Sequence, residues 1–403
     1  MMAYAFGTVK IKVRTIYLWL LSVLFIYSTS TFLRLSYNFY VAVFGYISFI
    51  LMTWASGFRW HFFSSKLLVG FLAAFISSLM FFVNGAGDVW TVYVSGEIHI
   101  FFWGHAFAFL ADHYPQNTIK RFLWFHLLVL LISMVATLHA LELYPLAARA
   151  MYGHADGIKD ANFLHKIGCG GFGFVYGFVC LAIGLVAAIR KKDTKTSKIG
   201  FIAFFILTVC LIIKSNFTMA LLFFFLTMGL CVLYAEKKEN AVGTALVLIL
   251  FTLGFIFQEE IVLLLKRIGE YMRMDMLVDK MTKIEHAQKT DNWMSLKRFQ
   301  VYNVSVQGFL SNPIFGSGYA SEDSQILTML SYIGIFGLSY IYLLWAACDL
   351  FAKYVNKIYM KVFFILIIII STLNMFTDMT LMSMVFFLTP ALLYWAAPAK
   401  ENG

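Results

Sequence analysis

Charged residues are scarce in this chain. Of its 403 residues, 13% are charged and 61% are hydrophobic, whereas soluble domains carry about 25% charged and about 45–50% apolar residues. This composition excludes a soluble globule. About twelve stretches of roughly 20 residues, the length that crosses a bilayer, would account for the apolar share. No polar block between them is long enough to form a core, so we expect one membrane domain over residues 1–403.

Cysteine is also rare, and the usual metal-binding patterns are absent. The five cysteines fall inside apolar runs without C-x-x-C spacing, which favours packing over disulfides or metal ligands. The histidines lack the H-E-x-x-H spacing of a zinc site, and no D-x-D metal–sugar motif occurs on the outer side assigned below. No nucleic-acid-binding motif is present. We therefore expect neither a metal nor another cofactor, and no nucleic-acid partner.

Apolar windows predict about 12 transmembrane helices, with boundaries uncertain by several residues. The windows are 15–33, 37–56, 67–83, 90–111, 121–143, 166–189, 199–214, 217–235, 241–258, 325–350, 360–377 and 380–397. Glycines 168, 170, 171, 173 and 177 favour close helix packing over a nucleotide loop, because no strand precedes them. The predicted fold class is all-α: a polytopic integral membrane protein with a long external loop that contains short helices.

The distribution of lysine and arginine predicts the orientation. With the N-terminus in the cytoplasm, 18 of the 31 Lys and Arg residues lie inside and only five lie in short outer connections. This is the positive-inside pattern. The remaining eight lie in the long external loop, residues 259–324, between the ninth and tenth spans. The net charge of +10 thus reflects topology and contact with anionic membrane lipid.

The long loop is the segment most open to a function, because loops of this length are uncommon otherwise. Helical spacing of apolar residues from Ile261 to Ile284 predicts an amphipathic helix on the membrane surface. A second helix is predicted from Ser295 to Leu310, ended by Asn312-Pro313 and two glycines. The loop holds eight cations and nine acids. Phosphate recognition there would depend on a few placed cations, with arginine favoured for its bidentate fork.

Several polar residues within or beside the spans are candidate site residues. Glu97 lies about two turns below the outer end of the fourth span, where it either pairs with a neighbouring helix or lines a polar cavity. Lys214 closes the seventh span, where it either snorkels to the interface or clamps an anion. Lys297 and Arg298, one turn before Tyr302, either solubilise an exposed helix or bind phosphate.

An ordered set of motifs then resembles a known family. The set is Arg298-Phe-Gln-Val-Tyr302, Asn312-Pro-Ile-Phe-Gly316-Ser-Gly318, Asp323-Ser-Gln325 and Gly334-Ile-Phe-Gly337. It resembles the Wzy-type polysaccharide polymerases and O-antigen ligases over residues 298–337, and the layout of spans extends the resemblance more weakly to most of the chain. The resemblance implies glycosyl transfer at the outer face of the bacterial cytoplasmic membrane. Donor and acceptor would be oligosaccharides linked to undecaprenyl diphosphate, and a chain-length regulator is left open as a protein partner.

The resemblance also implies roles for individual residues. Arg298 matches the family's loop arginine and would bind the diphosphate. Asp323 stands where ligases and many polymerases have histidine, which counts against lipid A-core ligase activity; with a pKa of about 3.9 it is a weak base unless burial raises it. Lys214 stands where relatives often carry a second arginine. Asn162, within a D-x-N-[FY] pattern, would hydrogen-bond sugar or cap a helix.

Other functions stay open at this point. A ligase would transfer the glycan to lipid A-core rather than extend a polymer. A flippase or other transporter of lipid-linked oligosaccharide would need polar residues through both leaflets, whereas the candidate residues gather toward the outer half. A non-catalytic scaffold explains an intramembrane glutamate poorly.

Overall fold

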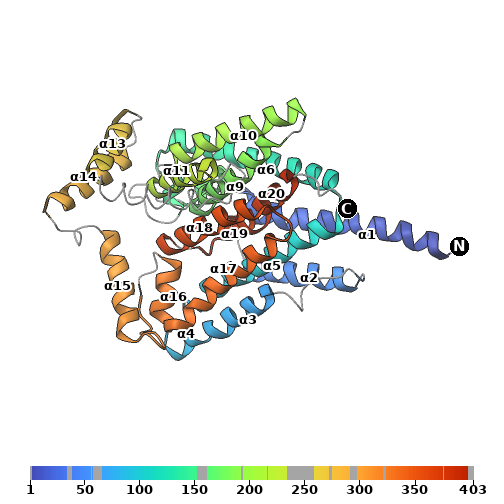
Figure 1. Cartoon of the computed structure of the whole chain (residues 1–403), viewed down its shortest axis with the longest axis horizontal. Coiled ribbons are helices and arrows are strands. Elements are labelled where there is room, and N and C mark those ends of the chain that lie inside the picture. The colour runs from blue at the N-terminus through green and yellow to red at the C-terminus, as the bar shows by residue number, and fades with distance from the viewer. Residues whose placement is uncertain are drawn as a thin grey trace.

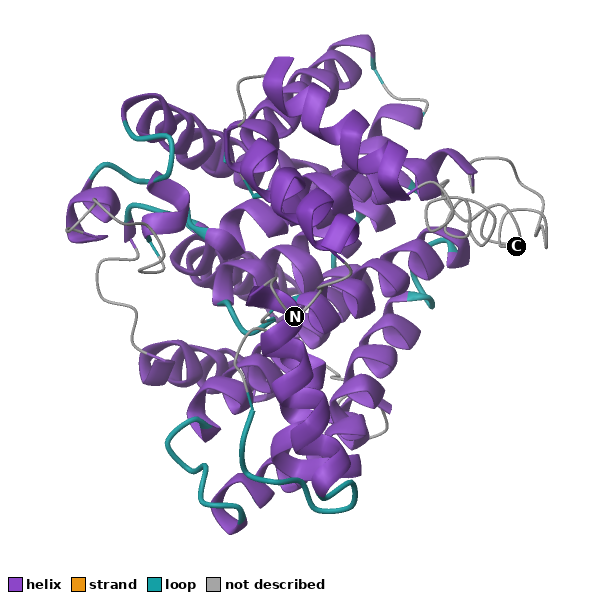
Figure 2. Ribbon diagram, turned by 90° about the vertical axis from the view of Figure 1, so that its left-hand side faces the viewer, coloured by secondary structure: helices purple, strands orange, loops and turns teal. Residues whose placement is uncertain are grey.

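Every regular element in the described part of the chain is a helix (Figure 2). The computed structural model describes residues 2–33, 39–55, 57, 66–151, 161–191, 194–215, 217–233, 258–271, 275–290, 297–320, 324–374 and 376–397. The first helices are α1 (Met2–Thr29), α2 (Phe39–Ala55), α3 (Lys66–Ser78), α4 (Met80–Val83), α5 (Trp90–His113), α6 (Gln116–Leu143), α7 (Ala147–Ala150), α8 (Ala161–Lys166), α9 (Phe172–Arg190), α10 (Lys195–Lys214) and α11 (Thr218–Leu233). They are followed by α13 (Gln258–Tyr271), α14 (Asp275–Thr290), α15 (Lys297–Ser311), α16 (Gln325–Ile333), the 3-10 helix η3 (Gly334–Gly337), α17 (Leu338–Phe351), α18 (Lys357–Leu373), α19 (Met379–Ser383), the π-helical η4 (Met384–Leu388) and α20 (Thr389–Ala396).

Six helical stretches of the described part are long and apolar enough to cross a membrane. They are Lys66–Val83, Gln116–Leu143, Phe172–Arg190, Lys195–Lys214, Gln325–Phe351 and Met379–Ala396. Four shorter apolar stretches are Arg14–Thr29, Val41–Ala55, Met219–Cys231 and Tyr359–Leu373. The all-α class is confirmed, and the chain has the helices of a membrane protein. The number of twelve spans stays a prediction, because most of the ninth window, 241–257, lies outside the described residues.

Helix α9 forms the centre of the bundle. It packs against α10, α11, α19 and α20, and almost all of its side chains are buried. Two glycines make the closest contacts possible: a Cβ at Gly177 would lie 2.5 Å from Met384 Sδ, and one at Gly184 would lie 2.9 Å from Leu392 Cδ2. Without hydrophobic driving force inside a bilayer, helices associate through such close approaches of small residues. For Gly177, the interpretation of the glycine cluster as packing is confirmed.

Large apolar side chains cover the outside of the bundle. Phe44, Ile76, Leu128, Ile206 and Phe225 are all more than half exposed, and they lie on five different helices. Contiguous apolar surface of this kind is unusual on a water-soluble monomer and is the normal lipid-facing surface of a membrane helix. The fold thus has a buried helical centre and an apolar outer surface.

One end of the bundle is rich in lysine and arginine, and we call it the basic end. Hydrogen bonds join the chain segments there: Tyr114 donates to the Arg14 carbonyl, Tyr354 to Asp112, and Tyr394 to the Ala111 carbonyl. In Figure 1 this end lies on the right, where α5 ends and α6 begins. Its described basic residues include Arg14, Lys66, Lys120, Arg121, Arg190, Lys191, Lys195, Lys198, Lys353 and Lys357.

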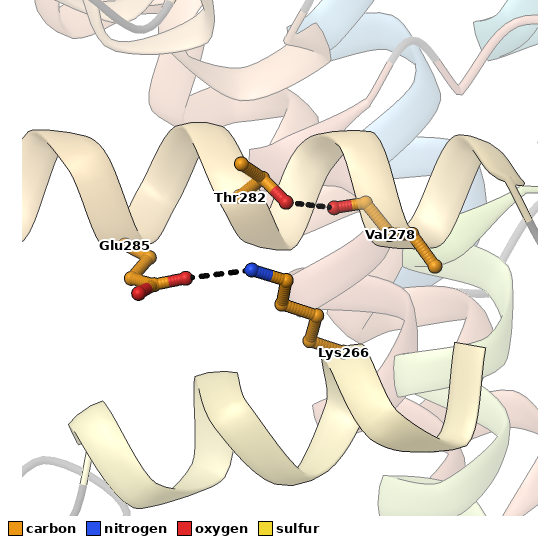
Figure 3. A network of polar contacts seen from close by, with 4 residues as sticks. All are labelled: Lys266, Val278, Thr282 and Glu285. Carbon is orange, nitrogen blue, oxygen red and sulfur yellow. Dashed lines mark hydrogen bonds and ion pairs between the residues drawn. The ribbon is translucent and has the colours of Figure 1, made fainter. Parts of the chain in front are cut away.

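The long polar segment lies at the opposite end, which we call the α15 end. Helices α13 and α14 pair at the upper left of the view, and α15 lies below them beside α16 (Figure 1). The prediction of one amphipathic helix from Ile261 to Ile284 is wrong. Helix α13 ends at Tyr271, α14 begins at Asp275, and the two helices pack side by side. Lys266 Nζ lies 3.0 Å from Glu285 Oε2 across this pair (Figure 3). The polar residues that interrupt the apolar pattern allow two short helices to cover each other.

Candidate functional site

Helix α15 carries the first motif and leans against the bundle. It covers Lys297–Ser311, so the helix predicted from Ser295 to Leu310 is confirmed. Its Tyr302 hydroxyl donates a hydrogen bond to the Leu373 carbonyl at 2.9 Å, at the last residue of α18. Positions 298 and 302 are four residues apart and share one face of the helix. The side chains of Lys297 and Arg298 lie outside the described part of the structure.

The glycine motifs hold the turn that follows α15. Gly316 and Gly334 have φ values of +82° and +65°, which only glycine adopts readily. A Cβ at Gly316 would overlap the Tyr332 carbonyl, and one at Gly334 would overlap the Ile314 carbonyl. The Ile335 amide donates to the Pro313 carbonyl at 2.9 Å. The Asn-Pro-x-x-Gly-x-Gly turn and the Gly-x-x-Gly helix are therefore backbone surfaces that pack directly on each other.

A residue far away in the sequence completes this turn. Asn84, between α4 and α5, donates from Nδ2 to the Phe315 carbonyl at 2.6 Å and to the Tyr332 carbonyl at 2.7 Å. Gly318, with φ +68°, lies against the Asn84 backbone. Sequence reasoning did not find Asn84, and an asparagine after an apolar run gives no signal beyond a turn. Its contacts fix the end of α15 to the helices that precede the fourth predicted span.

The segment after the turn is tied to the end of α18 by buried polar groups. Ser324 caps α16 by accepting from the Leu327 amide at 3.2 Å, and its hydroxyl donates to the Thr372 carbonyl. Gln325 is fully buried. Its backbone N–H donates to the Asn374 carbonyl at 3.1 Å, and its side-chain Oε1 accepts from the Phe376 backbone N–H at 3.4 Å. Asp323 precedes Ser324 directly and lies outside the described residues. The backbone at position 324 is thus anchored in the bundle.

A second polar centre lies where α18 gives way to α19. Asp378 caps α19, its Oδ1 accepting from the Thr380 amide at 2.9 Å and the Leu381 amide at 3.2 Å. A Cβ at Gly173 would overlap the Asp378 carboxylate, so this glycine makes the room that the carboxylate fills. Sequence reasoning did not select Asp378, which stands in the short connection between the last two predicted spans. An acidic residue in so short a connection was the available signal.

Histidine 99 is part of the same centre. It is fully buried on α5, within electrostatic range of Asp378, and its Nδ1 lies 3.0 Å from the Tyr46 hydroxyl of α2. The ring therefore has partners from neighbouring helices. His105 and His126 also bond within the protein, each through Nδ1 to the carbonyl four residues earlier.

Glu97 is buried between α5 and α3. Its side chain is 0% exposed, and its oxygens accept from the Ser78 hydroxyl at 3.3 and 3.4 Å. Tyr340 of α17 is fully buried close by, and its hydroxyl donates to the Phe376 carbonyl at 3.2 Å. A carboxyl group enclosed in this way by three helices favours the packing interpretation over the cavity-lining one.

Replacing Glu97 by glutamine should therefore leave folding and activity largely intact. The amide keeps the shape of the carboxyl group and its acceptor oxygen for Ser78, and it removes any cost of burying a charge. Glu97→Ala leaves a buried cavity, so we expect it to lose about 2 kcal/mol of stability or more, although the Ser78 hydroxyl keeps the Ala74 carbonyl as an acceptor. Thermal unfolding in detergent compares the three proteins. A folded Glu97→Gln protein without activity would restore the cavity-lining role.

The two remaining candidate residues lie on other helices. Lys214 ends α10, is about half exposed, and places Nζ 3.5 Å from Glu142 Oε1 of α6. Helix α10 packs on α6 and α9, whereas α15 packs on α16, so the described contacts do not bring Lys214 to the first motif. Asn162 is the second described residue of α8. The side chain of Asn162 lies outside the described part.

Comparisons with known proteins add no relative. No family model, no curated protein and no solved structure matches the chain. Among the described residues, no group of three or more His, Cys, Asp or Glu side chains is placed to hold a metal ion. Function must therefore be inferred from the motifs and from the geometry around α15 and the ends of α16 and α18.

Proposed function

We propose that this protein is a membrane glycosyltransferase that polymerises undecaprenyl-diphosphate-linked oligosaccharide units into O-antigen, capsule or exopolysaccharide. The ordered motifs from Arg298 to Gly337 are the basis of the proposal. The observation that carries it is the docking of α15 on the bundle. Tyr302 donates a hydrogen bond to the Leu373 carbonyl, so the helix face that includes positions 298 and 302 is turned toward the bundle. An arginine that only solubilised an exposed helix would not need this register.

The glycine contacts support the same proposal. Gly316, Gly318 and Gly334 allow the turn after α15 to pack directly on backbone. Ser324 and Gln325 then tie the next segment to the end of α18. The chain on both sides of Asp323 is thereby held against the helices, as a site that must orient two substrates requires. Pre-organisation of this kind is the protein's main contribution when no covalent intermediate is formed.

The distribution of charge supports the proposed location. Lysine and arginine gather at the basic end, and α15 lies at the other. By the positive-inside rule the basic end faces the cytoplasm, so the α15 end faces outward from the bacterial cytoplasmic membrane. About twelve spans would connect the two faces. Lipid-linked substrates would then reach the site from the outer leaflet.

In the proposed reaction the bond between the sugar anomeric carbon and the diphosphate oxygen breaks, and a bond to the acceptor hydroxyl forms. Arg298 stabilises the negative charge on the departing undecaprenyl diphosphate, with Lys297 beside it and Tyr302 holding their helix. Asp323 accepts the proton of the acceptor hydroxyl. Asn162 hydrogen-bonds sugar at the outer side of the site. Lys214, which the described contacts do not bring to the first motif, takes no part in the transfer step. No step requires a metal ion.

The experiment that tests the proposal uses the purified full chain in proteoliposomes. A synthetic undecaprenyl-diphosphate-linked repeat unit is added with and without a chelator, and products are separated by size. We expect a ladder of polymer lengths that survives chelation. Transfer of a single unit to lipid A-core without a ladder would favour the ligase. Movement of the intact lipid across the bilayer without product would favour a transporter.

A further inference from the structure

A cavity of about 480 Å³ lies at the basic end, far from α15. It is lined by Asn117, Lys120, Arg121 and Trp124, which occupy the first three turns of α6. An amide, an ammonium and a guanidinium group therefore converge with one aromatic ring. Hydrogen-bond donors and positive charge in this arrangement suit a phosphate group.

An aromatic stack forms the wall beside these cations. Trp124 packs on Phe201 of α10 with ring centroids 4.5 Å apart, and Phe201 packs on Trp395 of α20 at 5.2 Å. Trp124 can lie so close because α10 has a glycine there: a Cβ at Gly200 would lie 2.6 Å from the indole ring. Three helices thus build the wall, so its shape is set by the fold and not by one flexible side chain.

Two lysines are held over the end of this stack. Lys120 Nζ lies 5.6 Å and Lys191 Nζ 4.4 Å from the centre of the Trp395 ring. Lys191 also donates to the Trp395 carbonyl. Arg121 is exposed, and within the described residues no hydrogen bond or ion pair engages it. Positive charge is therefore concentrated around the cavity, which favours a ligand with negative oxygens.

The surface next to the cavity is apolar and exposed. Phe125 and Leu128 follow Arg121 and Trp124 by one helical turn, and they are 40% and 56% exposed. Ile199 and Ile202 on α10 are 57% and 38% exposed. A phosphate held by Lys120 and Arg121 would leave acyl chains free to lie along this strip, as basic pockets at the ends of membrane helices allow. Free phosphate would make no use of it.

We propose that this cavity binds the phosphate headgroup of an anionic membrane lipid, with the acyl chains lying on Phe125, Leu128, Ile199 and Ile202. The site lies on the face opposite the proposed transfer chemistry and does not depend on it. A bound lipid would join α6, α10 and α20 at the basic end, so it would stabilise the bundle by binding only the folded state.

Native mass spectrometry of the purified, delipidated full chain tests this proposal, with tetraoleoyl cardiolipin as the probe. We expect Arg121→Gln and Arg121→Glu to bind it roughly tenfold more weakly than the unmodified protein, the factor that one charge-assisted hydrogen bond contributes. Lys357→Gln removes one exposed cation from the same end and should bind as the unmodified protein does. Both Arg121 variants change an exposed side chain, and their thermal unfolding in detergent confirms the fold.

Two outcomes would overturn the proposal. If the Arg121 variants and the Lys357 variant retained cardiolipin equally, net charge and not the cavity would account for cardiolipin binding. Displacement of cardiolipin by millimolar inorganic phosphate would assign the cavity to a free anion. Dioleoylphosphatidylcholine, which has a phosphate and no net charge, should bind more weakly than cardiolipin.

Discussion

Replacing Arg298 by alanine should abolish polymer formation while the protein still folds. Removing one pre-organised donor from a developing negative charge costs on the order of 10²–10³-fold in rate. In the proposed reaction the departing group is a diphosphate, so the guanidinium fork would contact it through two oxygens. Arg298→Lys keeps the charge and loses the fork, and we expect an activity between those of the alanine variant and the unmodified protein. The polymer ladder in proteoliposomes is the measurement.

Arg267 provides the matched control for this experiment. It lies on α13, in the same long segment, and its side chain is exposed. Arg267→Ala removes the same charge without touching the face of α15 that meets α18, so we expect an unchanged ladder. Size-exclusion profiles and thermal unfolding show whether each variant is folded. A normal ladder from folded Arg298→Ala would remove this residue from the site and with it the main support for the proposed chemistry.

Replacing Gly316 by alanine should strongly destabilise the protein. At φ +82° an alanine is strained by roughly 1–2 kcal/mol, and its Cβ would overlap the Tyr332 carbonyl. Overpacking of this kind adds typically about 1–3 kcal/mol. The turn would have to leave Asn84 and η3 to relieve the overlap, which would release the segment before Asp323. We expect a lower unfolding temperature and a weaker ladder.

Alanine variants at two other glycines separate the effect of backbone strain from that of steric overlap. Gly85 has φ +72° and no atom within 4 Å of an added Cβ, so Gly85→Ala carries the strain alone. Gly229 lies inside α11 with open space around it, and alanine there should be neutral or stabilise the helix by roughly 0.5–1 kcal/mol. We expect the unfolding temperature to be highest for Gly229→Ala, lower for Gly85→Ala and lowest for Gly316→Ala. If Gly316→Ala unfolded no earlier than Gly85→Ala, the close packing of the motif turn would be wrong.

The local sequence pattern was sufficient to predict where helices lie, but not which helices pack against each other. The apolar windows and the Asn-Pro and glycine signals located helix α15 and the turn after it, because helix ends depend on a few neighbouring residues. Periodicity over 261–284 did not reveal that this stretch contains two helices, one ending at Tyr271 and the next beginning at Asp275, or that α13 pairs with α14. An amphipathic face is the same whether it covers lipid or another helix.

The candidate site shows the same division. The sequence selected Arg298, Tyr302 and Asp323 by their motifs, and the structure gave Tyr302 a partner at Leu373, 71 residues away. Asn84 was not selected, and Gln325 was named only as the end of a motif, because a polar residue beside an apolar run has no local mark of its eventual partner. The hydrogen bonds of Asn84 and Gln325 exist only once the helices that carry their partners are assembled, whereas Asp378 makes local capping bonds to α19.

The sequence by itself determined that this is an all-α chain with apolar helices of membrane-spanning length, and it predicts that most short-loop cations belong to one side. These properties follow from composition and from runs of about 20 residues, which each segment carries independently. Only the tertiary structure decided which small residues face which backbones, which polar groups meet, and where the cavity on α6 lies. Inside a bilayer every apolar face is equally compatible with lipid, so contact geometry rather than hydrophobicity selects the neighbours of each helix.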